Sequence, residues 1–251
     1  MHTDAAVRPV VVAGMRRAYL TAEDGHVTRA LDVAISSVLA AAALTMTVLA
    51  VRREILDARP MIAVRSWQVS SPELYAKAGN LIGPADAPVT LVVFADYECG
   101  FCRRMDETIA AVQVQQHLRF RTLYRHYPIK SRHAHAEAAA LAAECAAEQG
   151  HFEEYHRALM KDSAELSTEE LLRLAASASM PSSDAFSECL RSQRYRDRVK
   201  EDVQAGEELG LAGTPALLIG DSLFAGAMPA AELVRRLGRE ASRHRALRPS
   251  T

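Results

Sequence analysis

A short apolar run followed by two closely spaced cysteines constrains this chain more than any other feature. The run Val89–Ala95 is apolar and rich in β-branched residues, is too short for a typical helix, and predicts a strand buried on both faces. Cys99 follows within four residues, and Met105, Ile109 and Val112 then recur at helical spacing. The sequence therefore predicts a strand–turn–helix corner with Cys99 at the helix N-terminus.

The two cysteines of this corner, Cys99 and Cys102, are three residues apart. At a helix N-terminus this spacing brings the two Cα atoms within the about 4.4–6.8 Å that a disulfide requires. Free N–H groups and the helix dipole favour the thiolate of Cys99, and thiols so placed have pKa values of roughly 3.5–7.5, against about 8.5 for free cysteine. We expect Cys99 to be the exposed nucleophile and Cys102, one turn further, to be its shielded resolving partner.

Two other interpretations of the pair are weaker. A zinc site needs two more ligands, such as a second CxxC motif or paired histidines. Cys145 and Cys189 are each isolated in the sequence, and the histidines of His133–His135 lie beside a turn. Two inert buried thiols would not require a strand–turn–helix corner. A redox dithiol is therefore preferred, and neither a metal nor a cofactor is predicted.

The composition fits a globular protein with a substantial core. Of the 251 residues, 49% are hydrophobic, which is enough for one or two domains. The formal net charge of −1 gives no support for nucleic-acid binding, which needs a basic face. Four cysteines fit two disulfides but are too few for a disulfide scaffold, so packing must hold the fold.

An uncharged run near the N-terminus predicts a membrane anchor. Val33–Val51 is about 19 residues long, enough to cross the hydrocarbon layer as a helix. The alternative is a buried, alanine-rich core helix. About thirty residues precede the run, too many for the usual n-region of a signal peptide, so we expect the anchor to stay uncleaved. The predicted divisions are a tail over residues 1–30, a transmembrane segment over 31–51 and a linker over 52–78.

The rest of the chain predicts further strands and helices. Residues 61–69 show only a weak β pattern, and residues 79–89 carry the glycines and prolines of a turn. Residues 118–126 alternate, with Phe120 and Tyr124 on one face and Arg121 and Arg125 on the other, and predict a second strand. Helical patterns follow over residues 134–148, 151–162, 168–177, 183–190 and 195–209.

The last part of the chain changes from helical to strand periodicity. It predicts a strand, a turn at Gly220–Asp221, a second strand, and a closing helix with Pro229 in its first turn. The third of the preceding helices opens with the capping box Ser167-x-x-Glu170. The predicted order is therefore β-α-β, a block of helices, and β-β-α.

This order, the Cys99-Gly-Phe-Cys102 corner and the passage GLAGTPALLIGD resemble the thioredoxin superfamily. The passages PVTLVVFADYECGFCRR, AAECAAEQGHFEEYHRAL and LGLAGTPALLIGD are similar to its DsbA-like branch, which carries a helical insertion. The resemblance covers roughly residues 79–240. It implies an α/β thioredoxin fold over residues 79–245, with an inserted helical subdomain at about 131–209. The uncharged run described above adds a single transmembrane helix before this fold.

The resemblance also assigns roles outside the cysteine corner. Gly213, Thr214 and Pro215 stand where the superfamily has a cis-proline loop that faces the dithiol and binds the backbone of the substrate. Thr214 would contact the dithiol and influence its reduction potential. Cys145 and Cys189 would form a second, structural disulfide in the insertion, although two unpaired core cysteines remain an alternative.

Two departures from the family pattern leave the direction of electron flow open. Many relatives have an acidic residue six positions before the first cysteine, where this chain has Val93. Asp96 and Glu98 are nearer, and a carboxylate close to Cys99 would raise the pKa of that thiol. The dipeptide between the cysteines is Gly100–Phe101, where DsbA-like relatives often begin with proline. About 30 mV corresponds to 1.4 kcal/mol, so such changes can move the pair between oxidant and reductant.

These inferences together predict an extracytoplasmic thiol–disulfide oxidoreductase. We expect it to be anchored in the cell membrane with a cytoplasmic tail, and to introduce disulfides into exported proteins through Cys99 and Cys102. The expected partners are exported, cysteine-containing proteins or peptides and a membrane quinone-linked reoxidase, with no nucleic acid. The alternatives are a disulfide reductase or isomerase of the same fold, and a non-catalytic module that binds peptides.

Overall fold

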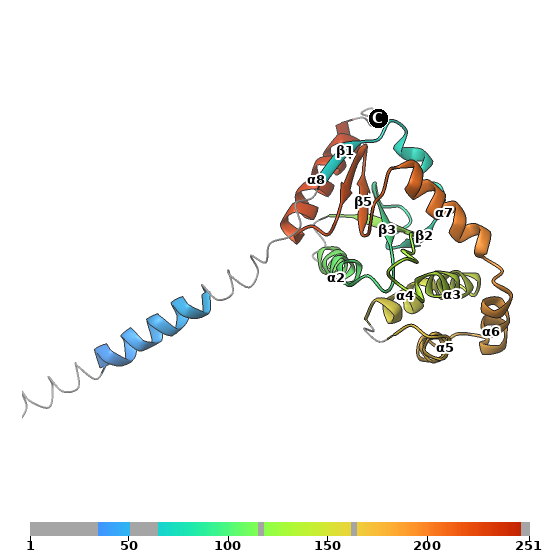
Figure 1. Ribbon diagram of the computed structural model, residues 1–251. Coiled ribbons are helices and arrows are strands. Elements are labelled where there is room, and N and C mark those ends of the chain that lie inside the picture. Colours follow the sequence, from blue (N-terminus) through green and yellow to red (C-terminus); the bar gives the residue numbers. More distant parts are fainter. Residues whose placement is uncertain (1–34, 51–64, 115–117, 162–164, 247–251) are drawn as a thin grey trace, which may run out of the picture. The chain divides into compact units, whose positions relative to one another are not determined.

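The computed structural model describes residues 35–50, 65–114, 118–161 and 165–246, and it separates into one unit up to Pro60 and another from Met61 (Figure 1). In the first unit, residues 35–50 form a helix in which the hydroxyl groups of Thr45 and Thr47 donate to the carbonyls of Ala41 and Ala43. No helix among the described residues is both long and apolar enough to cross a membrane. The tail predicted over residues 1–30 lies outside the described residues.

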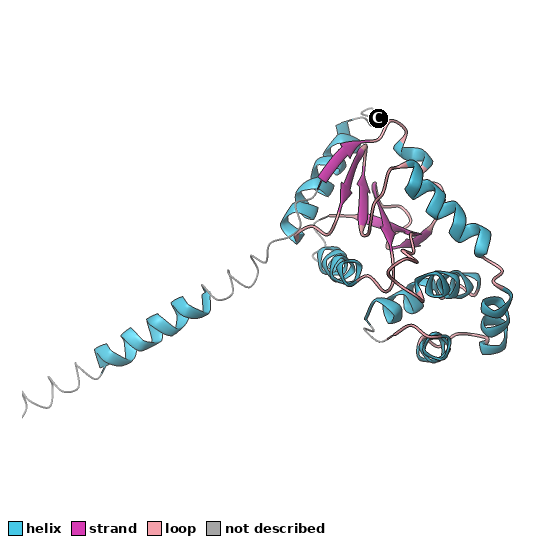
Figure 2. Cartoon of the chain, in the orientation of Figure 1, coloured by secondary structure: helices cyan, strands magenta, loops and turns pink. Residues whose placement is uncertain are grey.

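The second unit is built on a six-stranded mixed sheet in the order β1-β6-β5-β3-β4-β2 (Figure 2). Its strands are β1 Arg65–Gln68, β2 Asn80–Ile82, β3 Val89–Ala95, β4 Phe120–His126, β5 Ala216–Ile219 and β6 Ser222–Ala225. Strands β3 and β4 run parallel, and every other neighbouring pair is antiparallel. The parallel pair requires a crossover, which α2 supplies.

Helices cover both faces of the sheet and form a separate block at one end of it (Figure 1). Helices α2 Gly100–Val114 and α8 Ala230–Ala246 pack on one face, and α7 Arg196–Glu208 packs on the other. Between β4 and α7 lie α3 Ala136–Glu148, α4 Phe152–Lys161, α5 Thr168–Ser177 and α6 Ser183–Ser192. Helix α5 begins as expected, since the Ser167 hydroxyl accepts a hydrogen bond from the Glu170 N–H.

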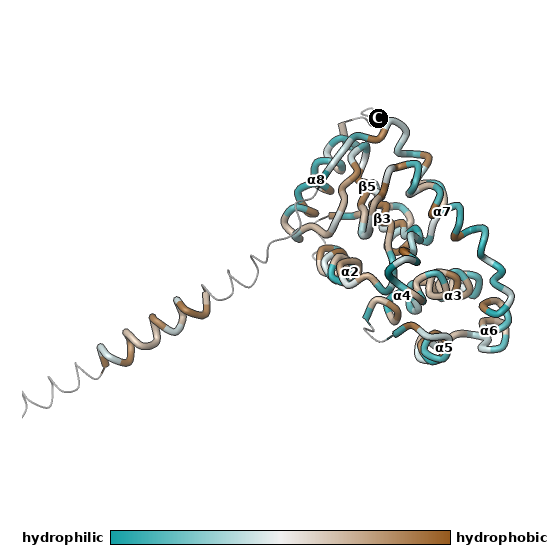
Figure 3. Tube along the Cα trace, viewed as in Figure 1, coloured by the Kyte–Doolittle hydropathy of each residue, from teal (hydrophilic) through white to brown (hydrophobic). Residues whose placement is uncertain are grey.

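The core lies on both sides of β3, as its unbroken apolar sequence predicts. Leu91 and Val93 belong to the cluster shared with α2 and α8, and Val92 and Phe94 belong to the cluster shared with the end of α7. All four side chains are buried. Figure 3 shows the apolar residues concentrated in β3 and β5, and teal, hydrophilic residues along much of α7. The central strands are therefore held rigidly, which fixes the loops at their ends.

Two short edge strands lie in segments for which the sequence predicted a linker with a weak β pattern and a turn. Within the linker predicted over residues 52–78, Arg65–Gln68 pairs with β6 and Pro72–Leu74 forms a 3-10 turn. Within the segment predicted as a turn, Asn80–Ile82 pairs with β4. Both strands are short and gain their stability from pairing with an existing sheet, which periodicity in so few residues does not reveal.

The strand predicted over residues 118–126 is confirmed as β4, and Arg125 on its second face is buried. Strand β4 lies inside the sheet, and its alternate residues are buried on both faces. Arg125 is buried, and its Nε donates to Asp202 Oδ1 at 2.5 Å. Asp202 Oδ2 also accepts from the backbone N–H of His126. A buried guanidinium with a buried carboxylate partner satisfies the rule that interior charges are paired.

Candidate active site

Strand pairing brings the two predicted parts of the site together. Strand β3 ends at Ala95, and its antiparallel neighbour β5 begins at Ala216, with Phe94 directly opposite Ala216. The segment that follows β3 and the segment that precedes β5 therefore meet at the same edge of the sheet. This register places Cys99 beside Thr214 although 115 residues separate them.

Cys99 directly precedes α2 and starts its first turn. The Cys99 carbonyl accepts hydrogen bonds from the N–H groups of Cys102 and Arg103, at 2.9 and 3.2 Å. The N–H of Asp96, at the end of β3, donates to Cys102 Sγ at 3.4 Å. Both sulfurs are free thiols in this structure, which therefore represents the reduced pair.

The loop before β5 contains a cis peptide bond between Thr214 and Pro215. Cys99 Sγ donates to the Thr214 carbonyl oxygen at 3.5 Å, and the Pro215 carbonyl accepts from the N–H of Gly226 at 2.8 Å. A Cβ atom placed on Gly213 would meet no other atom within 4 Å, so there is open space beside this residue. The loop thus presents its backbone next to the reactive sulfur.

Both cysteines are buried, and their acidities differ strongly. Cys99 is 7% exposed and Cys102 is 2% exposed. We expected Cys99 to be exposed, but its side chain is buried, although less so than that of Cys102. A hydrogen bond from Cys102 lowers the pKa of Cys99 to about 5, with further help from Thr214 and from the N–H groups of Cys102 and Phe101. Burial, together with the hydrogen bond to Cys99, raises the pKa of Cys102 well above its ordinary value. Near neutral pH the pair therefore carries its negative charge on Cys99.

The sequence predicted that the carboxylates of Asp96 and Glu98 would raise the pKa of Cys99. Neither is among the causes of the Cys99 pKa, and both are hydrogen-bonded to other parts of the chain. Asp96 is buried and accepts from the N–H groups of Glu98 and Ile129, and one of its oxygens lies 2.8 Å from His133 Nδ1. Glu98 accepts from the backbone N–H of His135 at 2.8 Å. The two carboxylates thereby tie the redox corner to the segment that precedes α3.

The dipeptide between the cysteines lies on the solvent side of the corner. Phe101 is one of the exposed large apolar residues, and the guanidinium carbon of Arg104 lies 4.4 Å from the centre of its ring. A Cβ atom on Gly100 would come no closer than 3.7 Å to Arg103, so this position has room for a side chain. Phe101 and Gly213 flank the recessed sulfur as surfaces that a substrate can touch.

One hydrogen bond near the cis-proline loop, from Tyr127 to Leu211, could not be predicted from the sequence. The Tyr127 hydroxyl donates to the Leu211 carbonyl at 2.9 Å, and the Leu211 N–H donates to the Gly206 carbonyl at 3.0 Å. A Cβ atom on Gly206 would lie 2.5 Å from the Tyr127 ring. Helix α7 can therefore approach Tyr127 only because Gly206 has no side chain.

The second cysteine pair forms a disulfide, which decides between the two alternatives left open by the sequence. Cys145 in α3 and Cys189 in α6 are bonded, with their Cα atoms 5.8 Å apart. Both residues are fully buried in the main core cluster. The bond joins two helices of the inserted block and lies outside the redox corner.

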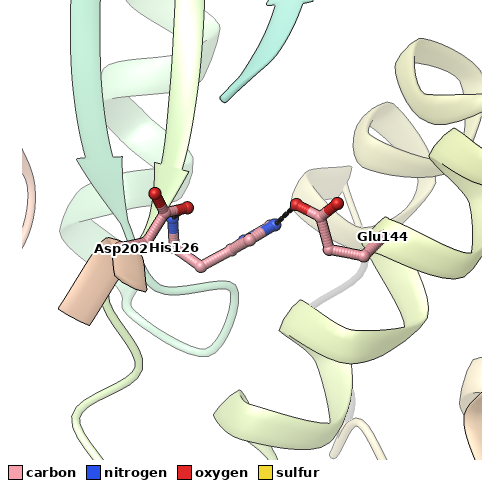
Figure 4. Close-up of side chains that lie close together, drawn as sticks. All are labelled: His126, Glu144 and Asp202. Atoms are coloured by element: carbon pink, nitrogen blue, oxygen red, sulfur yellow. Dashed lines mark hydrogen bonds and ion pairs between the residues drawn. The ribbon is translucent and has the colours of Figure 1, made fainter. Parts of the chain in front are cut away.

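A histidine and two carboxylates lie close together where β4, α3 and α7 meet. His126, Glu144 and Asp202 are all buried, and their ligand atoms lie within 4.8 Å of one another (Figure 4). His126 Nε2 is 2.9 Å from Glu144 Oε1, which also accepts from the Asn80 amide. Asp202 is already bound by the guanidinium groups of Arg125 and Arg198. Two cations on Asp202 oppose a metal ion there, and the group is a hydrogen-bonded link between β4, α3 and α7.

Comparison with solved structures identifies the fold. A thioredoxin-like oxidoreductase from Silicibacter pomeroyi DSS-3 is 25% identical with a TM-score of 0.61, over 71% of this chain and 99% of that one. The thiol-disulfide exchange protein alpha-DsbA2 from Wolbachia pipientis is 23% identical with a TM-score of 0.59, over 67% and 91% of the two chains. The catalytic domain of Proteus mirabilis ScsC is 22% identical with a TM-score of 0.58, over 69% and 96%.

Curated relatives match only in part. The Na(+)/H(+) antiporter NhaA 3 of Salinispora tropica is 37% identical over 137 residues, which are 55% of this chain and 21% of that protein. The antiporter NhaA 1 of Mycolicibacterium gilvum is 35% identical over 159 residues, 62% of this chain and 25% of that protein. This chain thus spans between a fifth and a quarter of the length of these relatives.

The fold and the site together define a thioredoxin-fold protein with a reactive dithiol. The sequence matches the thioredoxin family over residues 76–238, and the chain belongs to that family. Its fold is the DsbA-like form with a helical insertion, and the reactive dithiol together with the similarity to a thioredoxin-like oxidoreductase supports an oxidoreductase.

Proposed function

We propose that this protein introduces disulfides into exported proteins through the Cys99–Cys102 pair. One observation carries the direction: the pKa of Cys99 is lowered to about 5, whereas that of Cys102 is raised. A stabilised thiolate favours the reduced form of the pair over its disulfide, and a disulfide whose reduced form is stabilised is a strong oxidant. The pair should therefore take electrons from substrate thiols.

The order of the reaction steps follows from the exposure of the two sulfurs, because Cys99 is more exposed than Cys102. A substrate thiolate attacks Cys99 Sγ of the disulfide, a bond to the substrate forms, and Cys102 leaves as a thiolate that takes up a proton. A second substrate thiolate then attacks the substrate sulfur of the mixed disulfide. The substrate disulfide forms, and Cys99 leaves as a thiolate stabilised by Cys102 and by the N–H groups that begin α2. Two electrons pass from the substrate to the protein.

The loop at Gly213–Pro215 is the proposed seat of the substrate backbone. The open space at Gly213 and the position of Thr214 beside Cys99 Sγ support this role. The buried Thr214 hydroxyl helps to lower the pKa of Cys99 and forms no other hydrogen bond to a described residue, so a substrate can also use it. Thr214 therefore belongs to the determinants of the reduction potential.

We place the catalytic domain in the periplasm or another extracytoplasmic space, anchored by residues 31–51, with residues 1–30 in the cytoplasm. The Cys145–Cys189 disulfide supports this placement, because disulfides persist in oxidising compartments. A quinone-linked membrane protein is the proposed reoxidase of the pair. Protease accessibility in spheroplasts tests the topology: digestion of the domain without lysis is expected, and protection until lysis would overturn it.

A reductase or isomerase is the second candidate. The Gly100–Phe101 dipeptide, which lacks the proline expected of a DsbA-like oxidant, favours it. A reduction potential near the about −270 mV of thioredoxin would support this candidate, whereas one nearer the about −120 mV of DsbA would support the oxidase. A non-catalytic peptide-binding module would need neither the free thiols nor the lowered pKa of Cys99.

The decisive experiment is oxidation of a reduced substrate protein by wild type and by Cys99→Ala. Loss of activity to the background rate is expected for Cys99→Ala, because Cys99 is the attacked sulfur. A matched control is the double variant Cys145→Ala/Cys189→Ala, which removes cysteines outside the redox corner and should still oxidise the substrate while it is folded. Activity retained by Cys99→Ala would overturn the proposal.

A further inference from the structure

Two arginines directly follow the redox motif and take no part in the reaction steps above. Arg103 and Arg104 lie near the start of α2, which begins at Gly100. A Cβ atom placed on Gly100 would lie 3.7 Å from Arg103 Nη2 and 4.0 Å from Arg104 Nη1. Both guanidinium groups are therefore next to the residue that follows Cys99, on the solvent side of the redox corner.

Uncharged groups hold both arginines in place. Arg103 Nη1 donates to the Tyr97 carbonyl at 3.2 Å. The guanidinium carbon of Arg104 lies 4.4 Å from the centre of the Phe101 ring, within the distance of a cation–π interaction. Arg104 and Phe101 are exposed, and Arg103 is partly exposed. A carbonyl and an aromatic ring thus orient the two guanidinium groups without cancelling their charge.

The carboxylates that are nearest in the sequence do not neutralise the two arginines. Glu98 accepts from the backbone N–H of His135, and Asp106 is bound by two side chains of other elements. Glu107 is exposed. In the described part of the chain, neither arginine forms an ion pair with any of these carboxylates. Two positive charges therefore remain beside the reactive sulfur.

The position of these charges is contrary to the ordinary preference of helices. The N-terminus is the positive end of the helix dipole, where acidic side chains are stabilising and basic ones are not. Helices α3 to α8 each have an acidic residue in the first turn, whereas α2 has none. Helix stability therefore does not explain the two arginines, and neither is among the groups that lower the pKa of Cys99.

We infer that Arg103 and Arg104 select substrates that carry an acidic residue close to the reacting cysteine. Residues of an extended substrate chain are about 3.3 Å apart, so an Asp or Glu within about three residues of the substrate cysteine can reach the guanidinium groups beside Gly100. Arginine binds carboxylates through paired hydrogen bonds, which neutral and basic side chains do not match. The inference rests on the proposed reaction of Cys99 with peptide substrates.

The test compares the rates at which Cys99 reacts with peptides that differ only in the residue beside their cysteine. That residue is Glu, Gln or Lys, and each peptide carries its cysteine as a disulfide with 2-thiopyridine. In the full chain with Cys102→Ala, the Cys99 thiolate attacks the peptide sulfur and a protein–peptide disulfide forms. The 2-thiopyridine leaves with the electron pair, and its absorbance gives the rate. We expect the Glu peptide to react about fivefold faster than the Gln peptide, and the Lys peptide to react slowest.

Two matched variants remove the same charge from opposite ends of the sheet. Arg103→Gln/Arg104→Gln should bring the rates of the Glu and Gln peptides to within about twofold of each other. The control, Arg239→Gln/Arg245→Gln, removes two exposed guanidinium groups that line hollows at the ends of β3 and β5 away from the redox corner. It should keep the preference for the Glu peptide. Equal loss in both variants, or equal slowing of all peptides by Arg103→Gln/Arg104→Gln, would overturn the inference.

Salt dependence provides a measurement that needs no change to the arginines. Raising the ionic strength from about 0.01 M to about 1 M shortens the Debye length from about 30 Å to about 3 Å, so the preference for the Glu peptide should disappear. A preference that salt does not alter would contradict the inference. Equal rates for all peptides at low salt would refute the inference and leave the proposed function intact. Failure to oxidise substrates alongside the expected peptide preference would count against the proposed function alone, because this exchange needs only a reactive Cys99.

Discussion

The two cysteine pairs of this molecule differ in their chemical state and in their surroundings. Cys99 and Cys102 belong to one turn at the start of α2, and their free thiols lie at the edge of the sheet beside the cis-proline loop. Cys145 and Cys189 are 44 residues apart in sequence, and their disulfide joins α3 to α6 inside the core. The first pair lies where a substrate chain can approach, whereas the second is covered by packed helices.

This difference shows that burial alone does not decide what a cysteine does. Cys99 is also buried, but the side chains of Cys102 and Thr214 and the N–H groups that begin α2 favour its thiolate. The sulfurs of the second pair are surrounded by core residues that offer no such partners. Polar contacts around the sulfur, rather than exposure, separate a reactive pair from a structural one.

The largest expected effect comes from removing the structural pair. The chain-entropy estimate for a loop of this length is about 4 kcal/mol, so Cys145→Ala/Cys189→Ala should lower the free energy of unfolding by up to that amount. Urea titration followed by circular dichroism measures the loss. Substrate oxidation per folded molecule should be unchanged, and a parallel loss of activity would show that the two pairs are not independent.

The next effect concerns the acidity of the reactive pair. With a pKa of about 5, Cys99 is mostly thiolate at pH 6, whereas an ordinary thiol of pKa about 8.5 is under about 1% ionised, a difference of more than about a hundredfold. Alkylation of the reduced protein by iodoacetamide should therefore reach half its maximal rate near pH 5 and fall below it.

Mass spectrometry of the alkylated protein identifies the labelled residue. Label is expected on Cys99, with Cys145 and Cys189 protected until the protein is both denatured and reduced. A titration midpoint near 8.5 would contradict the assignment of Cys99 as a stabilised thiolate, and label on Cys145 in the native protein would contradict its place in the core.

The smallest effect tests whether the reactive pair depends on the support of its loop. Gly206→Ala places a methyl group against the Tyr127 ring, and overpacking of this kind costs about 1–3 kcal/mol. If Tyr127 moves, the Leu211 carbonyl loses its donor and the loop at Thr214 is less well placed. We expect slower substrate oxidation with a normal thiol titration of Cys99. Gly238→Ala in α8, where a Cβ atom would meet only Leu118 at 3.9 Å, is the control for a glycine-to-alanine change away from the site.

The sequence predicted the parts of the molecule that local patterns determine. The apolar run of β3, the helical spacing of α2 and the CxxC motif together located the redox corner. The long apolar-polar patterns of the inserted helices likewise matched the structure, and the family resemblance pointed to the loop at Pro215. Each of these signals lies within a few consecutive residues.

Features that depend on distant partners could not be predicted in the same way. Arg125 looks like a surface residue until Asp202, 77 residues later, is placed against it. Asp96 was expected to raise the pKa of Cys99, but its carboxylate accepts a hydrogen bond from the Ile129 N–H and lies next to the His133 ring. The short strand β1 exists because β6 is available to pair with it. In each case the missing information is tertiary, not local.

The buried disulfide also determines the order of disulfide formation and helix packing during the folding of this protein. Once α3 and α6 have packed, no oxidant can reach the sulfurs of Cys145 and Cys189, so their bond must form while the chain is still open. A newly made copy therefore needs an oxidant during its own maturation. If the proposed function holds, an older copy can serve as that oxidant, and each generation of the enzyme then prepares the next.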